Sequence, residues 1–177
     1  MITIQKSNIT FESIYKEEYI PKDDDFKKAN CLILPYKNFR SGVDYCFGEY
    51  TSEILQYLKE NSKGDVLVDV AATDENYREI ELHSFRLQIG IFITTSILLP
   101  VVINLVSNYV YDKIKRLHRK EGEVAVHVEY ISVLPDGSSK LLNYEGPADK
   151  LGEITRNIKQ LMETNAPLPN SSKEVDK

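Results

Sequence analysis

Hydrophobic positions are concentrated in one long segment in the second half of the chain. The segment Leu87–Tyr111 contains 25 consecutive residues without a charge. A run of this length and composition predicts one long apolar helix over roughly Leu87 to Leu117. Pro100 is expected either to kink this helix or to mark its start, because proline removes a backbone donor from a helix interior.

Shorter elements are predicted on both sides of this helix. Residues that alternate between apolar and polar predict strands, and apolar residues at spacings of three and four predict helices. Strands are therefore predicted at residues 31–34, 66–70, 78–84, 123–134 and 140–144, and helices at 51–60 and from about 147 onward. The Asp136-Gly137 step predicts a tight turn between the last two strands. Residues 1–30 and 36–49 are expected to be mainly surface loop and turn.

The order of these elements predicts an α+β fold. From Arg78 onward the order is βαββα, which suits a small, mostly antiparallel sheet packed against the long apolar helix. Residues 1–85 would form an N-terminal α+β part, and residues 86–164 the long helix plus a ββα unit. The two parts could also form one domain. Residues 165–177 contain two prolines, Asn-Ser-Ser and charged residues, and are expected to be a disordered tail.

Polar side chains form one narrow stripe along the predicted long helix. Its members fall mostly at spacings of three and four: Ser96, Pro100, Asn104, Ser107, Asn108, Tyr111 and Lys115. In a soluble fold such a stripe is the exposed edge of a helix that is packed on its other sides. In a bilayer it would be a seam at which helices hydrogen-bond through Asn and Ser.

A membrane span is the alternative to a packed helix. The span would run over about Ile89–Tyr111, and the basic residues that follow it would hold the C-terminus in the cytoplasm. That orientation requires the acidic residues 1–85 to cross the membrane, although the N-terminus has no signal-peptide pattern. The sequence therefore favours a cytoplasmic protein, with membrane attachment as the second interpretation.

Net charge and cysteine content narrow the function classes. The chain has a formal net charge of −5, and nucleic-acid binding is not expected because it needs a basic surface. Cys31 and Cys46 lie in apolar or aromatic surroundings and form no CxxC pair. Two buried free thiols are therefore expected rather than a disulfide or a zinc site.

One group of metal-ligand residue types lies on two predicted strands. Asp69 is on one strand, and Glu79, Glu81 and His83 share a face of the next. Such side chains can bind a divalent cation, so a small metal-dependent hydrolase is one hypothesis. However, polar residues alternate on the solvent face of any half-buried strand, and this simpler interpretation is favoured. Catalytic residues, metals and cofactors are therefore not expected, and none of the short phosphate-binding, serine-hydrolase or zinc-protease motifs occurs.

The C-terminal half contains an ordered set of features. They are the apolar helix ending at Asp112–Leu117, the strand Val124–Val133, the hairpin turn Pro135–Ser138, and Glu145–Pro147 before the last helix. In this order they resemble the small effector-associated constant components of bacterial conflict and antiphage systems. The resemblance implies an accessory or adaptor role in which no catalytic residue is expected.

The leading hypothesis is a non-enzymatic protein–protein interaction module that works as an accessory subunit in the bacterial cytoplasm. Its partner is expected to be another protein or a second copy of the chain. The predicted interaction residues lie on the polar stripe and at the basic end of the helix: Asn104, Ser107, Asn108, Tyr111, Lys115, Arg116 and Arg119. The second hypothesis is a membrane-anchored sensor or effector with a single span.

Overall fold

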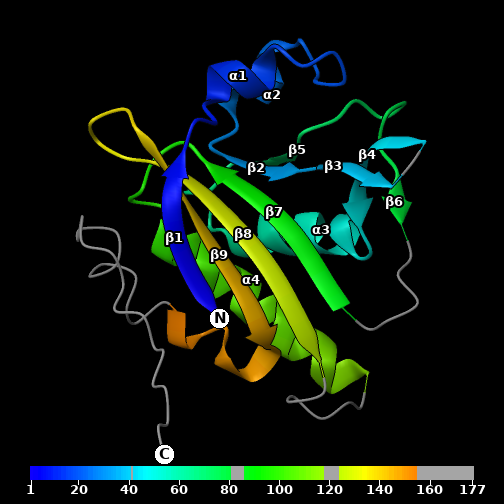
Figure 1. Cartoon of the computed structure of the whole chain (residues 1–177), viewed down its shortest axis with the longest axis vertical. Coiled ribbons are helices and arrows are strands. Elements are labelled where there is room, and N and C mark those ends of the chain that lie inside the picture. The colour runs from blue at the N-terminus through cyan, green and yellow to red at the C-terminus, as the bar shows by residue number, and fades with distance from the viewer. Residues whose placement is uncertain (41, 81–85, 118–123, 155–177) are drawn as a thin grey trace, which may run out of the picture.

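The fold is a mixed sheet with helices on both of its faces (Figure 1). The computed structural model describes residues 1–40, 42–80, 86–117 and 124–154 of the chain. In this part, six strands form the main sheet in the order β1-β9-β8-β7-β2-β5. The α+β class predicted from the sequence is confirmed, and the pairing of β7 with β8 and of β2 with β5 is parallel while the other pairings are antiparallel.

The central strand of this sheet, β7 (Arg86–Ile93), lies where the sequence predicts the first part of the long helix. The helical prediction is therefore wrong over these residues. β7 is covered on both faces: Ile89, Ile91 and Ile93 belong to one hydrophobic cluster and Phe92 to another. A strand that is buried on both faces reads as a continuous apolar run, and composition alone does not distinguish it from a helix.

Helix α4 (Leu99–Arg116) forms the remainder of the predicted long helix. Pro100 lies in its first turn, so the expectation that this proline marks the helix start is confirmed. Among the described residues, no helix is both long and apolar enough to cross a membrane. The predicted span over Ile89–Tyr111 is wrong, since it begins in β7 and reaches α4 only after an intervening turn.

Helices α4 and α3 (Thr51–Asn61) cover one face of the sheet (Figure 1). α3 matches the helix predicted at 51–60, although Tyr50 precedes it in a left-handed conformation and the Tyr50 side chain makes no capping hydrogen bond. α3 contributes Ile54 and Leu58 to the cluster, and both side chains are fully buried. α4 contributes seven buried residues: Leu99, Val102, Ile103, Val106, Tyr109, Val110 and Ile114.

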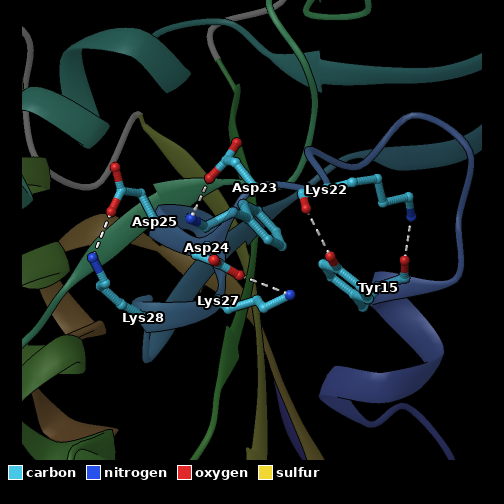
Figure 2. A network of polar contacts seen from close by, with 8 residues as sticks. Tyr15, Lys22, Asp23, Asp24, Asp25, Lys27 and Lys28 are labelled. Atoms are coloured by element: carbon cyan, nitrogen blue, oxygen red, sulfur yellow. Dashed lines mark hydrogen bonds and ion pairs between the residues drawn. The ribbon is translucent and has the colours of Figure 1, made fainter.

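The other face is covered at one end by α1 (Phe11–Tyr15) and α2 (Asp24–Lys28). The expectation of mainly loop over residues 1–30 is wrong, because β1 (Ile2–Ser7) also forms an edge strand beside β9. Figure 2 shows the polar contacts around α2. The Asp23 carboxylate accepts from the Phe26 N–H at 2.7 Å and thereby caps α2, which turns Phe26 into the core.

A second, smaller sheet joins β3 (Tyr36–Arg40), β4 (Val43–Gly48) and β6 (Glu79–Ile80). The expectation of turns over residues 36–49 is therefore wrong, and of the predicted strand 78–84 only β6 lies within the described residues. β4 passes close to β7. A Cβ atom at Gly48 would lie 2.4 Å from the backbone oxygen of Gln88, so only glycine allows this approach.

Strands β2 (Cys31–Leu34), β5 (Val68–Val70), β8 (Ala125–Val133) and β9 (Ser139–Pro147) match predicted strands. The tight turn between β8 and β9 is also confirmed, and Gly137 has a φ of +82° there. The helix predicted to start at Pro147 does not start there, because Pro147 is the last residue of β9. The 3₁₀ helix η2 (Ala148–Lys150) follows it. Strands from both sides of residue 85 thus share one sheet. The predicted tail, residues 165–177, lies outside the described residues.

Candidate interaction surface

A row of exposed residues runs along the outer side of α4. We call it the α4 stripe, and it consists of Ile97, Val101, Asn104, Asn108, Tyr111 and Lys115. Successive members are separated by four, three, four, three and four residues. Since an α-helix has 3.6 residues per turn, this spacing keeps the five members that lie within α4 on one side of the helix. Ile97 lies in the turn that precedes the helix. The buried residues of α4 lie on the opposite side and pack on α3 and the sheet.

The α4 stripe is unusual because it includes large exposed apolar and aromatic side chains. Ile97, in the turn before α4, is 80% exposed, and Val101 and Tyr111 are 43% and 45% exposed. Leu117, directly after the helix, is exposed as well. These are four of the seven large hydrophobic side chains that are exposed in the described part of the chain, so exposed apolar surface is concentrated on this helix. Single exposed apolar residues are common on protein surfaces, whereas a contiguous row is typical of a contact site.

The structure brings part of the predicted interaction set together on this row. Asn104, Asn108, Tyr111 and Lys115 are all exposed, and the Lys115 ammonium lies over the Tyr111 ring at 4.1 Å from its centroid. The exposure expected for the polar stripe in a soluble fold is confirmed for these residues. The interaction that they were predicted to make is not tested by their exposure and stays a prediction.

Other members of the predicted set are placed differently. The Ser107 hydroxyl donates to the Ile103 carbonyl at 2.7 Å, so this half-buried residue is satisfied by its own helix. Arg116 is exposed at the end of α4, where its Nε donates to the Asp112 carbonyl at 3.4 Å. Arg119 lies outside the described residues.

Lys113, from the predicted basic end, is turned toward the protein. Its ammonium lies 2.8 Å from a carboxylate oxygen of Glu53 on α3 and 3.8 Å from the centroid of the Tyr50 ring. The Tyr109 hydroxyl also donates to Glu53, at 3.3 Å. Burial, together with the charge of the Glu53 carboxylate, raises the pKa of Tyr109. This α3–α4 clamp (Tyr50, Glu53, Tyr109 and Lys113) fixes which side of α4 remains exposed.

The sequence prediction missed the apolar members of the α4 stripe. Ile97 and Val101 lie within the uncharged run, and in such a run apolar side chains are expected to be buried. One signal could have found them. Both residues continue, toward the N-terminus, the alternating three- and four-residue spacing that Asn104, Asn108 and Tyr111 define. This spacing is that of the contact seam between two packed helices.

The two proposed metal ligands that the structure describes, Asp69 and Glu79, lie in different sheets. Asp69 lies on β5 in the main sheet, 3.8 Å from the Lys59 ammonium, while Glu79 lies on β6 in the smaller sheet. The expectation that these residues occupy adjacent strands is therefore wrong. Glu81 and His83 lie outside the described residues. Among the residues that the structure describes, no group of three or more His, Cys, Asp or Glu side chains could hold a metal ion.

Glu79 has a structural role. Its carboxylate accepts from the Ser52 N–H at 2.7 Å and from the Tyr77 hydroxyl, and Ser52 lies in the first turn of α3. Burial on its own would raise the pKa of Glu79, but these hydrogen bonds hold the pKa below its usual value. The carboxylate therefore substitutes for the missing side-chain cap of α3 and is charged at neutral pH.

Both cysteines are free and buried, as the sequence predicts. Burial raises the pKa of Cys31 to about 12, which makes its thiol a poor nucleophile at neutral pH. His127 belongs to the opposite face of the main sheet, where its ring contacts Gln88 and Glu129. Cys31 and His127 therefore do not form a catalytic pair.

An open depression of about 660 Å³ lies beside the smaller sheet. Its aromatic wall is formed by Tyr19 and Tyr45, whose ring centroids lie 4.4 Å apart. The Tyr45 hydroxyl donates to Asn76 at 2.7 Å, and Lys37 forms an ion pair with Glu17. These polar groups pair with one another across the depression, so we do not assign it a ligand.

Comparisons of the chain with protein-family models, with curated proteins and with solved structures find no match to any of them.

Proposed function

We propose that the protein is an interaction module that docks a protein partner through the α4 stripe. The observation that carries this proposal is the set of exposed apolar side chains within the α4 stripe, at Ile97, Val101 and Tyr111. Burial of such side chains against a partner removes apolar area from water, which is the main favourable contribution to most protein association.

The middle of the α4 stripe adds the capacity for specific contacts. Asn104 and Asn108 each present one acceptor oxygen and two N–H donors from their side-chain amides. Apolar side chains that flank such amides resemble the centre of a protein–protein interface more than an ordinary solvated surface. The length of α4, 18 residues, corresponds to about 27 Å and gives a partner helix or groove several turns to contact.

This proposal includes the accessory role that the resemblance to bacterial defence components implies. The module would work in the cytoplasm, and the partner would supply whatever catalytic activity the assembly has. The α3–α4 clamp supports this arrangement, since it holds α4 rigid before any partner binds and so lowers the entropic cost of docking.

A photo-crosslinking amino acid at Tyr111 tests the proposal. The change is Tyr111→p-benzoylphenylalanine, which retains an aromatic ring at an exposed site, with the full-length protein produced in its native host cell. Leu67→p-benzoylphenylalanine is the matched control, because Leu67 is 48% exposed and Tyr111 45%. Leu67 lies next to β5 at the edge of the sheet.

We expect a covalent adduct of defined mass from position 111 and not from position 67. Adding Asn104→Lys and Asn108→Lys to the position-111 variant should reduce the adduct at least tenfold. Equal labelling at both positions, or no adduct at either, would reject the α4 stripe as the docking surface.

A further inference from the structure

The members of the α4 stripe are placed symmetrically along the chain about one midpoint. This midpoint lies between Asn104 and Asn108, two identical amides. The next residue on each side is apolar or aromatic, Val101 toward the N-terminus and Tyr111 toward the C-terminus. Ile97 and Lys115 form the outermost pair. Each of these three pairs is centred on the same point of the helix.

We propose that the partner of the α4 stripe is a second copy of this chain, docked with its α4 antiparallel about a two-fold axis at this midpoint. The inference rests on the proposed docking function of the stripe and names the partner. A two-fold interface uses the same patch on both copies, so the patch must be complementary to itself. Because the members are placed symmetrically about this midpoint, each one meets its counterpart on the other copy when the two helices run in opposite directions.

Each pair then makes a contact that its chemistry allows. Asn104 of one copy faces Asn108 of the other, and two side-chain amides can donate to and accept from each other. Val101 faces Tyr111, so both lose exposed apolar surface. Ile97 faces Lys115, whose methylene stem can cover it while the ammonium remains in water.

Charge decides the direction of the helices. In a parallel pair, Lys115 and Arg116 of one copy would lie beside Lys115 and Arg116 of the other, and like charges at an interface disfavour that arrangement. The antiparallel pair places the two basic ends at opposite ends of the interface. Each basic end then lies near the first turn of the partner's α4, where the described residues carry no charged side chain.

Disulfide trapping tests the register and the direction together. The two native thiols are buried, so introduced cysteines report the contact without interference. In the antiparallel pair, position 97 of one copy meets position 115 of the other. The two copies of position 97 lie about 27 Å apart along the helices, because the rise is about 1.5 Å per residue. Ile97 and Lys115 are both exposed, and a circular dichroism spectrum confirms that each variant folds.

We expect a mixture of the Ile97→Cys and Lys115→Cys proteins to form a disulfide-linked dimer under mild oxidation. Either variant alone should give at least tenfold less. Efficient linkage of Ile97→Cys to itself would overturn the antiparallel arrangement in favour of a parallel one. Absence of linkage in the mixture would overturn the proposed register.

Sedimentation equilibrium separates failure of this inference from failure of the docking function. The chain has a mass of 20.3 kDa, and the purified protein should approach twice this mass as its concentration rises. Asn104→Lys with Asn108→Lys should weaken the dimer at least tenfold, whereas Gln56→Lys, at an exposed position of α3, should not. A monomer at all concentrations overturns self-association. In that case a position-111 adduct whose mass is not twice that of the chain would still support docking of a different protein.

Discussion

The environment of the Cys31 thiol differs strongly from that of a free side chain in water. Cys31 lies on β2 between β5 and β7, and its side chain is fully buried in the cluster beneath the helices. The sequence could predict its burial, because Cys31 belongs to the short apolar run Cys31–Leu34. Such a run, when it is ended by a proline, is typical of a buried strand. The sequence could not predict which strands flank it, because both partners, Val68 and Ile93, are distant in the chain.

The raised pKa of Cys31 predicts a loss of stability in alkali. The thiol has an ordinary pKa of 9.0, and burial raises it to about 12 in the folded protein. Its stabilising contribution is therefore complete below about pH 9 and is lost as the pH rises toward 12. Between pH 8 and pH 10 the free energy of unfolding should fall by about 1 kcal/mol from this group alone.

Urea denaturation at the two pH values measures this change. Cys31→Ala is the control, since it lacks the thiol but retains every tyrosine that also titrates in alkali. The wild-type protein should lose more stability than the variant over this interval. An equal loss in the two proteins would show that Cys31 is accessible to water in the folded state.

At the scale of elements, the boundary between β7 and α4 falls inside one uncharged run, Leu87–Tyr111. The whole run was predicted as part of one helix. The β-branched residues Ile89, Ile91 and Ile93 at alternate positions are a strand signal that the length of the run obscures. Gly90 also disfavours a helix interior. Tertiary contacts determine that these residues form a strand, because β7 pairs with β8 on one side and with β2 on the other.

The α3–α4 clamp predicts unequal roles for two neighbouring lysines of α4. Lys113 is mostly buried and bonds to Glu53 and the Tyr50 ring, whereas Lys115 is exposed over Tyr111. Lys113→Met should lower the free energy of unfolding by about 1 kcal/mol, which is the scale of a partly buried ion pair with a cation–π contact. Lys115→Met should change it by less than about 0.5 kcal/mol.

Chemical denaturation of both variants at low and at high salt checks this prediction. The effect of Lys113→Met should shrink in high salt, since counterions screen the partly exposed Glu53 carboxylate in the wild-type pair. If the two variants were equally stable, the clamp would not contribute to holding α4 in place.

At the scale of the whole molecule, the main sheet joins strands from the N-terminal and C-terminal halves. β1 pairs with β9, and β2 lies between β7 and β5. The larger hydrophobic cluster likewise combines Leu58 of α3 with residues of α4, β7 and β8. Because no cluster is confined to one half, we expect residues 1–85 and 86–154 to unfold together.

Leu58→Ala tests this cooperativity. It truncates a fully buried side chain in the N-terminal half, and it should lower the free energy of unfolding by about 2–5 kcal/mol. Far-ultraviolet circular dichroism and tyrosine fluorescence should both report one urea transition, shifted equally, and the absence of tryptophan makes tyrosine the fluorescent probe. Two separate transitions, only one of them moved by the substitution, would show that the halves fold independently.

The sequence by itself determined the features that depend on neighbouring residues. These are the β8–β9 hairpin with its Asp136-Gly137 turn, helix α3, and the outward position of Asn104 and Asn108. Each follows from periodicity or turn chemistry within a few residues. Only the tertiary structure decided that residues 86–93 form a central strand and residues 1–30 a strand and two helices. It also decided that Ile97 and Val101 remain in water. The physical reason is that burial on each face depends on elements far away in the chain, and a local pattern carries no information about which elements will cover it.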